Sequence, residues 1–269
     1  MRFKNIKVDK VNIIKFEYCK IFRPLIKSIF LFNLNYYFIK KMVNTLPKEN
    51  IKTSHLVRSI KKTGGHFEVQ VINIKHETVD TYRTQKIIYA GQKHALKYVF
   101  PPDGYLFKNN EYAPWLIINF VLNAKGKSDS FWQNEFLTED PHFMGFIDNA
   151  SQVRRKENYR VFTAYYCFDS IQRILFASIT DKAQEIVTET IKKICLYFNQ
   201  DISSQVEKVF IKVMGHAMPI PKIGYLFNDK NLVRSEPNIV YAGVDNSRLP
   251  LLFEALDSGI QAVVELDLV

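Results

Sequence analysis

The sequence has little glycine, and it lacks the glycine-rich turn that opens a dinucleotide-binding fold. Only 10 of its 269 residues are glycine, and none of them forms a Gly-x-Gly-x-x-Gly run. Gly64-Gly65 is too short for this motif and follows no expected strand. In such folds the backbone N–H groups of the turn and the N-terminus of the next helix hold the pyrophosphate. We therefore do not expect the first half of a nucleotide-binding domain in this sequence.

Cysteine and histidine are also scarce and are not grouped. Cys19, Cys167 and Cys195 are odd in number, lie in apolar surroundings and have no CxxC spacing. This usage is typical of reduced core cysteines in a cytoplasmic protein. The six histidines include no HExxH motif and no Cys/His ligand set, so we expect no metal site.

The excess of positive over negative charge lies almost entirely at the beginning of the chain. The formal net charge is +10, but residues 1–48 hold eleven Lys or Arg against Asp9 and Glu17, a net charge of +9 that leaves +1 for the remainder. An extended phosphate-binding face needs clustered cations. The nearly neutral body therefore argues against a nucleic-acid-binding protein.

No apolar run in residues 1–48 is long enough to span a membrane. The apolar stretch 28–39 is interrupted by Asn33 and Asn35, whereas a spanning helix needs about 20 predominantly apolar residues. We expect a divergent or poorly ordered extension, with weak contact to a membrane surface as the alternative. Met42 is an alternative start that would remove nearly all of the positive excess.

The remaining sequence alternates helix and strand patterns, which predicts a mixed α/β fold. The clearest helix is 181–198, with Ile191 and Ile194 on its apolar face. Pro101-Pro102-Asp103-Gly104 predicts a turn. We expect a helix at 53–61, turns at 64–65 and 215–216, and strands at 67–74, 84–90, 115–122, 144–150, 159–168, 174–179 (a weak pattern) and 206–213.

The C-terminal part predicts a buried strand that runs into a helix. Residues 239–242 form a short apolar run, and Gly243 permits a sharp turn before Asp245. Pro250 suits the first turn of the next helix. We expect an apolar stripe of that helix to pack on the sheet, with Asp257 and Gln261 facing outward; the stripe consists of Phe253, Leu256, Ile260 and Val264.

An ordered series of short motifs resembles the C-terminal part of flavin-containing amine oxidoreductases, over roughly residues 50–265. The series begins with Ala113-Pro114-Trp115 and ends with the strand, corner and helix described above. Its other members are Trp132 with Asn134, Gly145-Phe146-Ile147, Gly215 to Pro221, Gly243, Asp245, Glu254, Ala255 and Gly259.

The resemblance implies an FAD-dependent oxidoreductase, a flavoprotein that moves a hydride from a small-molecule substrate, such as an amine, to the flavin. Because the glycine motif is missing, we expect a truncated or degenerate chain of doubtful activity; a non-catalytic binding or structural protein and a peripheral membrane protein anchored by residues 1–41 are the alternatives. The implied organisation is an extension (1–48), a partial FAD-binding domain in two segments (49–98 and 236–269) and a substrate-binding domain (99–235).

The resemblance also implies site residues, each with a structural alternative. Val69 and Val71 are candidates for backbone contact with the adenine, or ordinary core valines. Gly243 and Asp245 are candidates for the flavin ribityl chain or the pyrophosphate, or turn residues. Trp115, Phe146, His216 and Met218 are candidates for the substrate pocket, or structural residues. The incomplete domain would leave an apolar edge, which we expect a partner chain or a second copy to cover.

Overall fold

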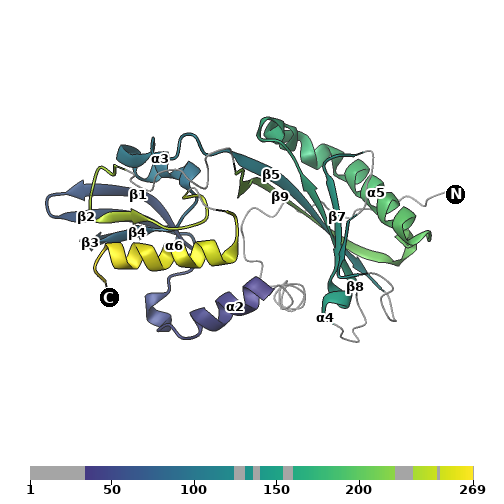
Figure 1. Cartoon of the computed structure of the whole chain (residues 1–269), viewed down its shortest axis with the longest axis horizontal. Coiled ribbons are helices and arrows are strands. Elements are labelled where there is room, and N and C mark those ends of the chain that lie inside the picture. The colour runs from purple at the N-terminus through teal and green to yellow at the C-terminus, as the bar shows by residue number, and fades with distance from the viewer. Residues whose placement is uncertain are drawn as a thin grey trace. The chain divides into compact units, whose positions relative to one another are not determined.

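The computed structural model describes residues 34–123, 131–135, 140–153, 160–221, 233–246 and 249–268, which form helices and mixed sheets (Figure 1). They divide into two compact units. The first unit comprises Met1–Lys41 and Tyr112–Met218, and the second comprises Met42–Glu111 and Pro219–Val269. The domain boundaries expected from the sequence were 98/99 and 235/236. Helix α2 (Leu34–Val43) crosses the division at residue 41.

The first unit is built on a five-stranded sheet with the order β6-β7-β8-β5-β9. β5 and β8 are antiparallel and place Ile118 opposite Ala164. The bounds of the strands are β5 Tyr112–Leu122, β6 Gln133–Asn134, β7 Phe143–Asp148, β8 Arg160–Cys167 and β9 Val206–Pro219. The helical segments are α4 (Asn149–Val153), η5 (Ser170–Ser178), α5 (Ile179–Phe198) and η6 (Ser203–Gln205).

Helix α5 covers one face of this sheet (Figure 1). Its side chains Val187, Ile191 and Ile194 are almost fully buried and belong to one cluster with alternate residues of β5, such as Ile118 and Phe120. The period-2 alternation of a strand and the 3.6-residue period of a helix bring these apolar faces together. The predicted helix and its apolar face are confirmed.

The second unit contains an antiparallel meander, β1-β2-β3, and a separate parallel pair, β4 with β10. β2 is the central strand of the meander, and its Val69 lies opposite Ile60 and Tyr82. The bounds of the strands are β1 His55–Thr63, β2 His66–Asn73, β3 Thr78–Thr84, β4 Ile87–Tyr89 and β10 Ile239–Tyr241. The helical segments are η2 (Lys48–Asn50), η3 (Lys93–Ala95), α3 (Leu96–Val99), η4 (Pro101–Asp103) and α6 (Leu252–Glu265).

The parallel pair joins two segments that are far apart in the sequence. Ile87, Ile88 and Tyr89 of β4 lie beside Ile239, Val240 and Tyr241 of β10. The segment Tyr112–Met218 of the first unit lies between the two strands in the sequence. The two strands lie in the segments 49–98 and 236–269, which the resemblance assigned to one domain; they pair in the structure, and α6 covers them (Figure 1).

The orientation of α6 differs from the prediction. The side chains that it buries are Ser258 and Ala262, and Leu266 just beyond its end is also buried, whereas Phe253 and Ile260 of the predicted inner stripe are exposed. Ala262 and Leu266 pack against Val240 and Ala242. Small side chains let the helix approach the short strand pair closely, whereas the larger side chains of the predicted stripe would keep it farther away.

Several elements differ from their predicted type. Residues 55–63 form strand β1, not a helix, because the Gly64-Gly65 turn folds them back onto β2, whose ladder outweighs a short helical pattern. The strand expected at 84–90 is two elements, since β3 pairs with β2 while β4 pairs with β10. Residues 174–179 lie mostly in η5, and Gly215-His216 continues β9 without a turn.

No helix within the described ranges is both long and apolar enough to cross a membrane.

Candidate functional site

The carboxyl ends of β4 and β10 form a buried polar position in the second unit. Each strand is followed by a glycine and, two residues later, by an ionisable side chain: Gly91 and Lys93 after β4, Gly243 and Asp245 after β10. The carboxyl ends of parallel strands lie at the same edge of the sheet, which is where α/β folds bind ligands. This edge, defined by Gly91, Lys93, Gly243 and Asp245, is called the strand-end corner below.

A buried ion pair joins the two sides of the strand-end corner. Lys93 donates its backbone N–H to Asp245 Oδ2 at 2.7 Å, and its Nζ lies 3.3 Å from Asp245 Oδ1. The Lys93 Nζ also donates to the carbonyl oxygens of Gly91 (3.0 Å) and Ala242 (2.6 Å). Lys93 is 1% exposed and Asp245 6% exposed. The paired charges and their hydrogen bonds compensate for the loss of water.

The surroundings of Lys93 perturb its titration. Burial lowers the pKa of Lys93, while the carboxylate of Asp245 acts in the opposite direction. The rings of Tyr89 and Phe107 lie 5.5 and 5.8 Å from its Nζ. Burial, with a smaller contribution from Asp245, raises the pKa of the Tyr89 hydroxyl. The buried ammonium of Lys93 therefore lies between a carboxylate and two aromatic rings.

The Gly243 backbone is held in the corner by α6. Its φ of 122° lies in a region that favours glycine. Its N–H donates to Ser258 Oγ of α6 at 3.1 Å. A Cβ at Gly243 would lie 3.3 Å from Asp245 Oδ1 and 3.5 Å from Lys93 Nζ. The space beside this glycine is thus filled by the chain's own ion pair.

Val69 and Val71, the two candidates for the adenine, lie on β2 of the same unit. Val71 is 6% exposed, and Val69 is partly buried against a cluster that contains Phe67 and Ile239. Both side chains point to the face of the meander that carries Phe67, because they alternate with it along the strand. Their side chains therefore pack toward the core, while the predicted contact with the adenine concerns their backbone and stays a prediction.

The candidates for the substrate pocket are divided between two faces of the sheet in the first unit. Phe146 is 2% exposed and lies in the α5-side core, with its ring 5.2 Å from that of Tyr197. Trp115 alternates with the core residue Leu116 and therefore faces the other side, where its ring is 5.8 Å from Tyr165. The structure does not bring Trp115 and Phe146 into one pocket.

His216 and Met218 lie on β9 and are both partly buried. The His216 ring makes an edge contact with Tyr112 of β5, with ring centres 5.6 Å apart. Arg173 links β9 to β5 near His216, because its guanidinium donates to the carbonyl oxygens of Gly215 (2.6 Å) and Tyr112 (2.9 Å). Both candidates thus lie on a strand of the sheet.

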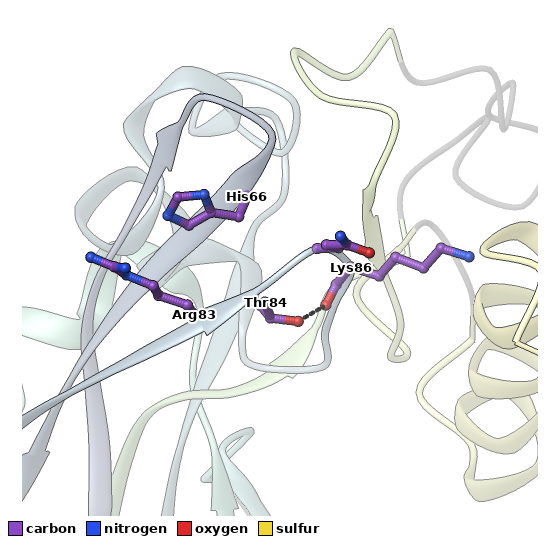
Figure 2. A pocket seen from close by; sticks show the side chains of 5 residues that line it. His66, Arg83, Thr84 and Lys86 are labelled. Carbon is purple, nitrogen blue, oxygen red and sulfur yellow. Dashed lines mark hydrogen bonds between the residues drawn. The ribbon is translucent and has the colours of Figure 1, made fainter.

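A pocket of about 410 Å³ lies elsewhere in the second unit, where β3 leads toward β4 (Figure 2). Its basic side chains already have partners within the chain. Arg83 Nη2 lies 3.3 Å from Glu68 Oε1, and Lys86 Nζ donates to the carbonyl oxygen of Leu266 at the end of α6. None of the site residues predicted from the sequence contributes to it. The lining residues are His66, Arg83, Thr84, Gln85 and Lys86.

Lys93, the central residue of the strand-end corner, is not among the site residues predicted from the sequence. The available signal was the repeated pattern of a short apolar strand, a glycine and an ionisable residue two positions later, with opposite charges in the two copies. Among the described residues, no group of three or more His, Cys, Asp or Glu side chains is placed to hold a metal ion.

Comparison with known proteins corrects the sequence-based family assignment. No family model matches this chain, and no curated protein matches it. Solved structures that it resembles include the crystal structure of AlpK (12% identity, TM-score 0.35, covering 78% of this chain and 37% of that one). Another is tetracycline destructase Tet(51) (11% identity, TM-score 0.33, covering 78% and 52%). Neither is named as an amine oxidase, so the predicted membership of the amine oxidoreductase family is wrong. The chain spans about a third to a half of the length of these structures, and scores of this size do not establish a common fold.

Proposed function

We propose that this chain is a non-catalytic protein built on a flavin-oxidoreductase type of architecture, in which the strand-end corner is closed by an internal ion pair. Its role is then binding or structural, and it does not act as a flavoenzyme by itself. The observation that carries this proposal is the fully buried Lys93 ammonium, which occupies the strand-end corner with Asp245.

The architecture supports a nucleotide-cofactor ancestry. Two parallel strands, separated in sequence by an inserted unit with an antiparallel sheet, end at one edge and carry a glycine turn before α6. Crevices at the carboxyl ends of parallel strands are the usual ligand sites of α/β folds. This geometry supports the nucleotide-cofactor ancestry alone and identifies no substrate.

The residues at the strand-end corner do not fit a bound FAD. A cofactor atom at the position of the absent Gly243 Cβ would contact Asp245 Oδ1 at 3.3 Å and Lys93 Nζ at 3.5 Å. The Asp245 carboxylate is engaged by both the backbone N–H and the ammonium of Lys93. The sequence also has no phosphate-binding glycine turn. No reaction step through a flavin is therefore assigned to this chain.

Flavin content tests the proposal directly. The full chain is purified and its visible absorbance is recorded, and FAD is then titrated in while the flavin fluorescence is followed. We expect a colourless protein with no saturable change at micromolar FAD. One FAD per chain in the purified protein would contradict the proposal.

If FAD does bind, Asp245→Ala locates the site. A carboxylate that contacts the cofactor would make the affinity fall in this variant, whereas unchanged affinity would exclude the strand-end corner. Thermal melting of the variant without FAD provides the control, because Asp245 also pairs with Lys93.

A contact with a membrane surface is a second candidate, favoured by the basic beginning of the chain. Within the described part, Ile39, Met42 and Val43 of α2 are exposed and lie beside Lys40 and Lys41. Residues 1–33, which carry most of the predicted anchor, lie outside the described residues. Sedimentation with vesicles tests this candidate: we expect binding to phosphatidylserine-containing vesicles that 1 M salt abolishes. No binding at low salt would refute it.

A further inference from the structure

The side chain of Gln172 fastens the first turn of η5 to the residue before β7. Gln172 Oε1 accepts the backbone N–H of Asp169 at 2.9 Å, and Gln172 Nε2 lies 3.2 Å from His142 Nε2. The other ring nitrogen, His142 Nδ1, lies 3.2 Å from the carbonyl oxygen of Cys167. The imidazole ring stacks on Phe168, with ring centres 4.8 Å apart. The hydrogen bond between the two side chains is called the His142–Gln172 contact below.

The hydrogen-bonding groups around His142 fit only one protonation state of its ring. The carbonyl oxygen of Cys167 can only accept, so Nδ1 carries a hydrogen atom. The amide oxygen of Gln172 is used by the N–H of Asp169, so the amide NH2 group faces His142 Nε2, which therefore accepts. The ring that satisfies both conditions is the neutral imidazole with its hydrogen on Nδ1.

A proton on His142 Nε2 is incompatible with this arrangement. It would place two donors, the ring N–H and the Gln172 amide NH2, 3.2 Å apart. Turning the amide over does not help, because its NH2 group would then face the N–H of Asp169. Either way one of the two hydrogen bonds made by Gln172 is lost. Proton uptake by His142 and the complete set of contacts at Gln172 therefore exclude each other.

The ionisable neighbours of His142 keep their charge while a histidine ordinarily titrates, between about pH 5 and 8. Burial tends to raise the pKa of Asp140, but the hydrogen bonds from Lys193 and the His142 backbone outweigh it and lower that pKa. Burial tends to lower the pKa of Lys193, but its bond to Asp140 outweighs this and raises it. Burial also raises the pKa values of Tyr166 and Cys167. The neighbours are Asp140, Tyr166, Cys167, Asp169 and Lys193.

We propose that the His142–Gln172 contact is a pH-dependent fastening of the first turn of η5, made while His142 is neutral and broken when its ring takes up a proton. Because the fastened form binds one proton fewer, its stability is present at high pH and is lost as the pH falls. The release is local, since the Arg173 guanidinium stays charged and keeps its hydrogen bonds to Gly215 and Tyr112. This inference concerns the first unit alone, so it does not depend on the strand-end corner or on FAD binding.

The amide hydrogen exchange of Asp169 reports the fastening, because this N–H donates to Gln172 Oε1. NMR of the full-length protein gives its exchange rate at pH 8 and pH 5, and division by the rate of an unfolded peptide at the same pH gives the protection. We expect the protection to fall about fivefold at pH 5, the size expected for one lost hydrogen bond. The amide of Ile118, in the centre of the sheet, should keep its protection. A constant protection at Asp169, or a parallel fall at Ile118, would overturn the proposal.

Two substitutions separate the proposed fastening from a general effect of acid. Gln172→Glu replaces the amide by a carboxylate, which accepts from both Asp169 and a protonated His142, so the protection at Asp169 should be higher at pH 5 than at pH 8. His142→Phe keeps an aromatic ring against Phe168 but takes up no proton, so the protection should not depend on pH. The control His76→Gln changes an exposed histidine after β2 and should show the wild-type fall. A wild-type fall in His142→Phe, or in Gln172→Glu, would refute the role of this contact.

The ring nitrogen shifts of His142 give a second readout that does not involve exchange. At pH 8 the hydrogen should be on Nδ1, because that nitrogen faces the carbonyl oxygen of Cys167. A hydrogen on Nε2 at this pH would contradict the proposal, since the fastened form would then already contain the two facing donors.

Discussion

The Lys93 ammonium lies 3.3 Å from Asp245 Oδ1, although 152 residues separate the two in the sequence. Each follows one strand of the parallel pair, so the ion pair exists only when β4 and β10 lie side by side. Both side chains are almost completely buried. Each buried charge therefore has its partner only when the two segments of the second unit have come together.

Lys93→Met should strongly destabilise the protein. The substitution leaves the Asp245 carboxylate buried without its cationic partner, which typically costs about 3–5 kcal/mol. Urea unfolding followed by circular dichroism gives the free energy of unfolding. A decrease in the free energy of unfolding of less than about 1 kcal/mol would mean that water reaches the strand-end corner and solvates the Asp245 carboxylate.

The double variant Lys93→Met/Asp245→Leu should recover part of this loss, because it removes both charges together. Lys192→Met is the matched control: Lys192 pairs with Glu189 at 2.7 Å on the exposed side of α5. Its effect should stay within about 0.5 kcal/mol.

Gly145→Ala should destabilise the first unit. Gly145 has a φ of 99°, and an added Cβ would lie 2.1 Å from the carbonyl oxygen of Asn134. Backbone strain and overpacking each cost about 1–3 kcal/mol. Gly65→Ala is the control, because a Cβ there meets nothing within 4 Å. Melting temperatures of the two variants should differ clearly, and equal values would contradict the local geometry at Gly145.

Stability in acid should depend on Asp140. Burial tends to raise the pKa of Asp140, but the hydrogen bonds donated by Lys193 at 2.6 Å and by the His142 backbone outweigh it, so the pKa is lowered. A carboxyl group with a lowered folded-state pKa stabilises the protein above its unfolded pKa, near 3.8, and this contribution disappears as the pH falls through the folded-state value.

Asp140→Asn should therefore reduce the free energy of unfolding at pH 7 by about 0.5–1 kcal/mol, since the pair is partly exposed. It should also flatten the loss of stability below about pH 4. Urea titrations between pH 2 and pH 7 measure both effects. Glu185→Gln, which removes an exposed carboxylate of α5, is the control. Identical acid profiles for the wild type and Asp140→Asn would refute the assignment.

Ile191→Ala tests the core of the first unit. Ile191 is 1% exposed between α5 and the sheet, and truncation of such a residue costs about 2–5 kcal/mol. Leu196→Ala, on the exposed side of the same helix, should change stability by less than about 0.5 kcal/mol. Similar losses at both positions would mean that α5 packs through a different face.

Much of the first unit could be predicted from the sequence because its elements are long and periodic. The 20-residue helix α5 and the 11-residue strand β5 carry enough repeats to show both their type and their buried face. β1 could not be predicted, since a nine-residue segment with three apolar residues fits a helix or a strand. Its pairing with β2 decides the outcome, and that pairing is a tertiary interaction.

The candidate site was predicted only in part. The sequence identified Gly243 and Asp245 at the end of a buried strand, but Lys93 enters the site through the parallel pairing of β4 with β10. Trp115 and Phe146 occur near motifs that suggested one pocket, yet strand alternation and the position of α5 send their side chains to opposite faces.

The sequence by itself determined the mixed α/β class, the concentration of the net positive charge at the beginning of the chain, and the presence of an amphipathic C-terminal helix. The tertiary structure alone decided which side of that helix is buried. The helical periodicity of a sequence identifies an apolar stripe, but it does not show which side of the helix packs against the rest of the protein. The short strand pair accepts Ser258 and Ala262 at close range, and Phe253 and Ile260 are left on the surface.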